Sequence, residues 1–179
     1  MLKIDNTALV IVDVQGKLAT LMTNRDEFFR KIVMIARGAK ILGLPILWNE
    51  QLPDKLGPTI PELKDALAGM NPLVKNTFSC CGNPDFKNVL KKSNCRQVLL
   101  TGMETHVCVY QTAADLIADG FEVHLVADAV SSRTPEDRRI GIDAITAMGA
   151  KITSVEMCFF EILKVAEGDK FKEIIKIVK

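Results

Sequence analysis

One cysteine lies where an α/β protein can place a nucleophile. Cys108 follows an apolar run at residues 98–100 and a turn that begins at Gly102, and a helical pattern starts directly after it. With Thr105 as the N-cap, the sequence predicts Cys108 at the third position of a helix. Unpaired backbone N–H groups and the positive end of the helix dipole favour the thiolate there. The residue is also compatible with a small apolar side chain buried in a helix, the usual fate of a lone cysteine.

Two charged residues follow other apolar runs. Asp13 comes directly after residues 8–12, and Lys75 follows residues 73–74. The carboxyl ends of parallel strands meet at one edge of a sheet, which is where open α/β folds place their chemistry. Asp13 alone is also compatible with an acid that caps a loop, and a lone lysine such as Lys75 is nearly always a solvated surface residue. Their significance comes from the predicted edge that they share with Cys108.

These three side chains are the parts of an acyl-transfer site. Asp13 is suited to moving a proton between a thiol and a leaving amine, and Lys75 to holding Asp13 and stabilising the thiolate by its charge. The oxyanion of such a reaction needs N–H donors. We expect those donors in the turn before the cysteine, at Glu104, Thr105 and Val107.

The elements that must position these residues are visible as alternating patterns. Strands are expected at residues 8–12, 45–48, 73–74, 98–100, 123–126 and 152–155. Near-continuous apolar strands with helices between them require a parallel sheet that is covered on both faces. The 179 residues contain no linker or low-complexity tract, so a single domain, residues 1–179, is expected. Residues 49–82 are non-periodic, with one expected short helix at 61–67, and loops of that length are usually functional.

Composition limits the classes of partner. The net charge of +1 offers no electrostatic case for nucleic acid or an anionic membrane. No apolar run approaches the ~20 residues of a transmembrane span, and the first residues show no signal-peptide core. Five cysteines at irregular spacing argue against a secreted disulfide framework. A cytoplasmic protein with reduced thiols is therefore expected.

Three separated motifs resemble those of the isochorismatase-like cysteine hydrolases. They are Asp13-x-Gln15, Lys75 before Thr77-Phe78-Ser79, and Gly102-x-x-Thr105-x-x-Cys108-Val109. The resemblance implies three α/β/α layers with a six-stranded parallel sheet of order 3-2-1-4-5-6, and a catalytic triad of Asp13, Lys75 and Cys108. It also implies a non-proline cis peptide at Met103–Glu104.

The same resemblance implies an activity. The superfamily includes nicotinamidases and N-carbamoylsarcosine amidohydrolase, so the expected reaction cleaves the C–N bond of a small amide or carbamoyl compound through a thiolate and an acyl-enzyme. Residues 48–54 lack the histidine ligands that nicotinamidases carry there, and Glu50 with Asp54 makes a poor zinc site, so neither metal nor cofactor is expected. Cys108 stands where isochorismatases have glycine, which argues against vinyl-ether hydrolysis.

Loop residues are expected to line the substrate pocket in the manner of isochorismatase-domain-containing hydrolases. The predicted substrate-binding residues are Gln15, Gln51 and Phe78. Gln51 would supply a polar wall and Phe78 an apolar one, while ordinary loop packing explains both equally. The apolar Ile174, Ile175 and Val178, together with the habit of the family, predict a homo-oligomer.

Other chemistries fit less well. His106 lies two residues from Cys108, and i,i+2 positions on a helix do not face each other, so a papain-type pair is not expected. Only Gly16 follows the first strand, without a dinucleotide-binding glycine motif. Gln15 stands where an aspartyl-phosphate phosphohydrolase needs a second acid. The adjacent thiols at residues 80–81 form no metal or redox motif. The main alternative is a non-catalytic binding or interaction protein that keeps the fold.

Overall fold

The centre of the protein is a sheet of six parallel strands in the order β3-β2-β1-β4-β5-β6. The computed structural model describes all 179 residues. The strands are β1 (Thr7–Val12), β2 (Ile46–Gln51), β3 (Leu73–Lys75), β4 (Gln97–Met103), β5 (Glu122–Ser131) and β6 (Lys151–Thr153). Every residue of β1 and β4 is buried, because both faces of the sheet are covered. The predicted fold class and strand order are confirmed.

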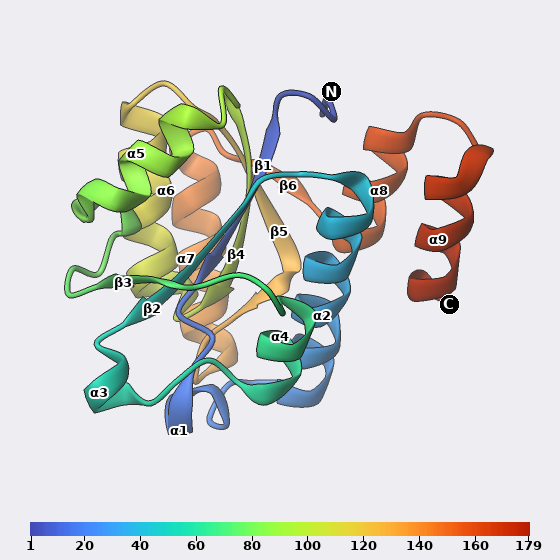
Figure 1. Ribbon diagram of the computed structural model, residues 1–179. Helices are drawn as coiled ribbons and strands as arrows, with labels where there is room; N and C mark the ends of the chain where they lie inside the picture. The colour runs from blue at the N-terminus through green and yellow to red at the C-terminus, as the bar shows by residue number, and fades with distance from the viewer.

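Helices form a layer on each face of the sheet. The helices are α1 (Gly16–Ala19), α2 (Arg25–Leu42), α3 (Pro53–Leu56), α4 (Pro61–Ala66), α5 (Pro84–Lys92), α6 (Tyr110–Ala118), α7 (Pro135–Ala147), α8 (Val155–Leu163) and α9 (Gly168–Val178). Figure 1 shows α5, α6 and α7 on one face and α2, α4, α8 and α9 on the other. Two apolar clusters fill the spaces between the layers, one around Phe28 and Phe159 and one around Phe86 and Leu116. None of the helices has the length and apolar character needed to cross a bilayer.

The C-terminal helix packs on this core. Ile174 is fully buried, and Ile177 and Val178 are partly buried against the cluster that contains α2 and α8. In Figure 1, α9 lies outside α8 at the margin of the molecule. Much of the apolar face that predicted a second subunit is therefore used within the chain.

The carboxyl edge of the sheet is built from short elements. The strand order reverses between β1 and β4, and loops leaving these two strands run to opposite faces. At this edge lie α1 and α3 (lower edge of Figure 1), a 3-10 turn η1 (Cys80–Gly82) and a π-helical turn η2 (Thr105–Val109). The non-periodic stretch contains α3 in addition to the one short helix that was expected. A proline at the first helical position starts each of them.

Candidate active site

The three predicted catalytic residues meet at the carboxyl edge of the sheet. Asp13 directly follows β1, Lys75 is the last residue of β3, and Cys108 lies in η2 after β4. The Nζ of Lys75 is 2.6 Å from Oδ2 of Asp13, and Cys108 is close enough for the Asp13 charge to act on its thiol. All three are nearly inaccessible, with 3% of Asp13, 3% of Lys75 and 6% of Cys108 exposed.

Lys75 is held by three short hydrogen bonds. Its ammonium donates to Oδ2 of Asp13 at 2.6 Å and to the carbonyl oxygens of Thr77 and Phe78 at 2.9 Å each. These bonds use the three protons that a lysine ammonium carries. Lys75 therefore acts as a fixed positive charge beneath the site and has no free donor for a substrate.

Asp13 keeps one oxygen free. Its Oδ1 is buried without a hydrogen-bond partner, whereas Oδ2 is bound to Lys75. Burial raises the pKa of this carboxyl above its ordinary value, and the charge and hydrogen bond of Lys75 act in the opposite direction. The left-handed backbone of Asp13, with φ 53°, turns the chain out of β1 at this point. An unpaired carboxylate oxygen beside a thiol is suited to proton transfer.

The thiol of Cys108 is neutral in this environment. Its pKa is raised to about 12, chiefly by burial and then by the charge of Asp13, and the charge of Lys75 only partly opposes these two effects. The expectation of a thiolate favoured by Lys75 and the helix start is therefore wrong for the free protein. Its Sγ donates to Oε1 of Gln51 at 3.4 Å.

The turn before Cys108 differs from its predicted geometry. Glu104, not Thr105, is the residue before the helical turn, and it adopts the left-handed conformation with φ 57°. Thr105 does not cap the turn with its side chain, because its hydroxyl donates to the carbonyl of Ser131 at 2.9 Å. The chain contains no cis peptide bond, so the one expected at Met103–Glu104 is absent. The left-handed Glu104 makes the sharp turn instead.

The predicted oxyanion donors are unequally available. The N–H of Thr105 donates to Oγ of Ser132 at 3.0 Å, and that of Val107 to the carbonyl of Glu104 at 2.8 Å. The N–H of Glu104 has no hydrogen-bond partner. Of the three donors, Glu104 is therefore the one free to meet a substrate oxygen.

Two residues that were not predicted from the sequence, Ser132 and Arg133, bind the turn before Cys108. Ser132 binds both the N–H of Thr105 and Nδ1 of His106, the latter at 3.1 Å. Arg133 pairs with the carboxylate of Glu104 at 3.2 Å. Both residues directly follow β5, and this position at the end of a strand, which they share with Asp13, is the sequence signal that marks them.

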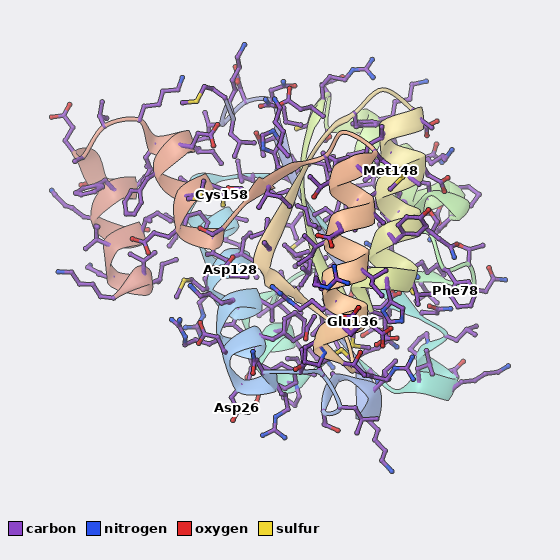
Figure 2. The ribbon with its side chains drawn as sticks, turned by 180° about the vertical axis from the view of Figure 1, so that it is seen from behind. Asp26, Phe78, Asp128, Glu136, Met148 and Cys158 are labelled. Atoms are coloured by element: carbon purple, nitrogen blue, oxygen red, sulfur yellow. The ribbon has the colours of Figure 1, made fainter.

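The predicted substrate-binding residues have three different positions. Gln15 is fully buried, and its side chain bonds only to backbone: Nε2 donates to the carbonyls of Gln51 and Gly57, and Oε1 accepts from the N–H of Gln51. It joins the end of β2 to the loop after α3 and leaves no group for a ligand. Phe78 is 53% exposed, and Figure 2 places it at the outer margin of the molecule. Its carbonyl, not its ring, reaches Lys75.

Gln51 lies at the centre of the cluster. Its Oε1 is 3.4 Å from Sγ of Cys108 and 3.5 Å from Nζ of Lys75, and its Nε2 donates no hydrogen bond within the protein. An uncommitted amide N–H₂ next to the thiol is a suitable donor for a substrate carbonyl. A cavity of about 340 Å³ adjoins Lys75, between Leu52 and Val74.

No cluster of three or more potential metal ligands is present. The carboxylate of Glu50 is occupied by Thr59, which donates to it from both N–H and hydroxyl at 2.6 Å. Thr59 in turn accepts from the indole of Trp48 at 2.8 Å. Glu50 therefore anchors the loop after α3 rather than pairing with Asp54.

Fold and cluster together define a class of protein. It is a three-layer α/β protein with a cysteine and a buried Asp–Lys pair at the point where the strand order of a parallel sheet reverses. The family model of the isochorismatase domain matches residues 7–157. The chain therefore belongs to the isochorismatase family.

Relatives agree in fold over nearly the whole chain. The MAR1 ribonuclease structure from Caenorhabditis elegans is 36% identical, with a TM-score of 0.93 over 99% of this chain and 91% of that one. YcaC from Pseudomonas aeruginosa, with hexane-2,5-diol and covalent acrylamide, is 26% identical, with a TM-score of 0.92 over 98% and 90%. Isochorismatase domain-containing protein 1 of Danio rerio is 39% identical over 86% of this chain. The chain spans only 55% of that zebrafish protein.

Proposed function

We propose that this protein is a cysteine hydrolase that cleaves the C–N bond of a small amide or carbamoyl compound through an acyl-enzyme intermediate. The observation that carries the proposal is the pairing of a buried neutral thiol with a carboxylate that has one oxygen free. Asp13 offers Oδ1 to the proton of Cys108, while Lys75 fixes Oδ2. No metal or cofactor takes part in the proposed reaction.

The first half-reaction follows from these positions. Asp13 takes the thiol proton as Sγ of Cys108 attacks the substrate carbonyl carbon, so a C–S bond forms and the carbonyl π electrons move to oxygen. The N–H of Glu104 and Nε2 of Gln51 stabilise the resulting oxyanion. The oxyanion then collapses, the C–N bond breaks, and Asp13 returns its proton to the leaving nitrogen.

In the second half-reaction, water is the attacking group and the sulfur of Cys108 is the leaving group. Asp13, again ionised, takes a proton from water as the water oxygen attacks the thioester carbon. The C–S bond then breaks, and the acid product leaves as the thiol regains its proton. Lys75 stays charged throughout and stabilises whichever of Asp13 and Cys108 carries the negative charge.

Family relatives support the enzyme class. Acrylamide is an electrophile of the kind that cysteine sulfur attacks, and YcaC of Pseudomonas aeruginosa holds it covalently. The experiment below also distinguishes two other functions. One is the non-catalytic binding protein, and the other is RNA cleavage, because the Caenorhabditis elegans relative is a MAR1 ribonuclease.

The decisive experiment measures turnover of a panel of small amides, carbamoyl compounds and a short RNA. The wild type should release ammonia or amine from at least one small amide, equally before and after prolonged chelation. The Cys108→Ala variant should lose this turnover by at least about a thousandfold, since no covalent route remains, whereas Cys95→Ala should keep it. Full activity in Cys108→Ala, RNA cleavage alone, or binding without turnover across the panel would contradict the proposal.

A further inference from the structure

A second cavity, of about 430 Å³, lies between α5 and α6. Arg96 and Phe121 on its rim directly precede β4 and β5, so the cavity opens toward the amino edge of the sheet, opposite the Asp13–Lys75–Cys108 cluster. We propose that this cavity binds a small amphipathic anion: an apolar, preferably aromatic body that carries one carboxylate, sulfonate or phosphate group.

The floor of the cavity is apolar. Phe86 and Leu90 come from α5 and Leu116 comes from α6, and all three are buried, with at most 3% exposed. Their common cavity falls within the ~300–1,000 Å³ typical of small-molecule sites. An apolar body that lies against this floor loses part of its contact with water, which favours its binding.

The rim is cationic. Lys87, Lys91 and Arg96 face a single acid, Asp119, which pairs with Lys87 at 3.2 Å. The side chains of Lys91 and Arg96 make neither an ion pair nor a hydrogen bond within the protein. Two unpaired cations at the mouth of one apolar cavity complement an anionic head group.

The guanidinium of Arg96 is also oriented. It lies 5.7 Å from the ring centroid of Phe121, a cation–π contact that keeps it over the cavity rim and occupies none of its N–H donors. A guanidinium with a free fork of donors binds carboxylate, sulfonate or phosphate oxygens in pairs. Arg96 therefore differs from an ordinary solvated cation, because its guanidinium is held in position while its N–H donors stay free.

The test compares two probes that differ by one charged group. We expect 1-anilinonaphthalene-8-sulfonate to bind at least about tenfold more tightly than uncharged N-phenyl-1-naphthylamine, and to weaken as salt is added. In methyl NMR spectra, the sulfonate should shift Leu90 and Leu116 and leave Leu63 and Leu67, which lie on the opposite face of the sheet, unchanged. Equal affinity for both probes, no binding, or shifts confined to Leu63 and Leu67 would overturn the proposal.

Charge-removing variants locate the anion. Lys91→Gln with Arg96→Gln should weaken the sulfonate about tenfold or more and leave the uncharged probe unchanged. Lys92→Gln is the matched control, because Lys92 lies on the same helix and does not line the cavity. An equal loss in the control would overturn the proposal. Binding should persist in Cys108→Ala, so this result does not depend on the proposed catalysis.

Discussion

At the scale of single residues, the reacting groups are those with polar atoms that lack a hydrogen-bond partner in the protein. The groups that hold them in place have used all of their polar atoms in internal hydrogen bonds. Lys75 and Gln15 have used their polar atoms inside the protein. Asp13 keeps one oxygen and Gln51 keeps its amide nitrogen, both beside the thiol of Cys108. The reacting atoms are therefore few, and their protonation states determine how activity depends on pH.

The first residue-scale prediction concerns the pH profile. The active form contains ionised Asp13 and a neutral thiol. Because burial raises the pKa of Asp13 above its ordinary value, kcat/KM should fall as pH drops through that raised value. It should stay level on the alkaline side well past neutrality, since the pKa of Cys108 is raised to about 12. Steady-state kinetics between pH 4 and 10 would check this, and activity that rises tenfold per unit through pH 8–9 would contradict it.

Asp13→Asn should have opposite effects on two properties of the same thiol. Turnover should be lost, because no base remains to take the proton. Alkylation of Cys108 by iodoacetamide at pH 8 should become faster, because the anion that raises the pKa of the thiol is gone while Lys75 remains. Each unit by which the pKa falls gives about tenfold more thiolate. Peptide mapping after timed labelling measures the rate, and slower labelling in the variant would show that Asp13 does not raise this pKa.

At the scale of elements, a helix on one face controls the turn that carries the nucleophile. A Cβ at Gly141 in α7 would lie 2.7 Å from the backbone nitrogen of His106 in η2. Gly141→Ala should therefore push η2, and Cys108 with it, although alanine favours the helix by about 1 kcal/mol.

We expect kcat/KM of Gly141→Ala to fall about tenfold or more, because small displacements of reacting groups are costly, while the urea midpoint changes little. Gly38→Ala is the matched control: its Cβ would meet the ring of Phe159 on the other face of the sheet. It should lower the urea midpoint and leave kcat/KM unchanged. Equal loss of activity in both variants would mean that the effect is general destabilisation.

The positions of strands could be predicted from the pattern of apolar residues along the sequence. The role of a residue that depends on a single tertiary contact could not. Apolar runs located all six strands, and their order followed from the family resemblance. The site could be placed because Asp13, Lys75 and Cys108 all lie at or just beyond the carboxyl ends of strands. The partners of Gln15 are backbone atoms 36 and 42 residues away, which no pattern of residue types reveals. The raised pKa of Cys108 depends chiefly on burial, which the position of the residue at the start of a helix does not reveal.

At the scale of the whole molecule, the surface near the site retains apolar groups that no other element covers. Val74 on the edge strand β3 is 55% exposed and Phe78 is 53% exposed. Because much of the apolar face of α9 is used within the chain, exposed apolar side chains such as these are a structural reason to expect a homo-oligomer. Light scattering at micromolar concentration should give a mass of at least twice 19.8 kDa, and a value of 19.8 kDa would refute the expectation.

The position of β1 has a consequence for synthesis on the ribosome. β1 lies between β2 and β4, and its register with β4 begins at Thr7 and Gln97. One edge of a strand that is fully buried in the folded protein therefore has no partner until about ninety more residues have been made. At ~5–20 residues per second this wait lasts about 5 to 20 s. Nascent chains arrested before residue 97 should therefore bind holdase chaperones or aggregate, and those arrested after the release of β4 from the exit tunnel should do so much less.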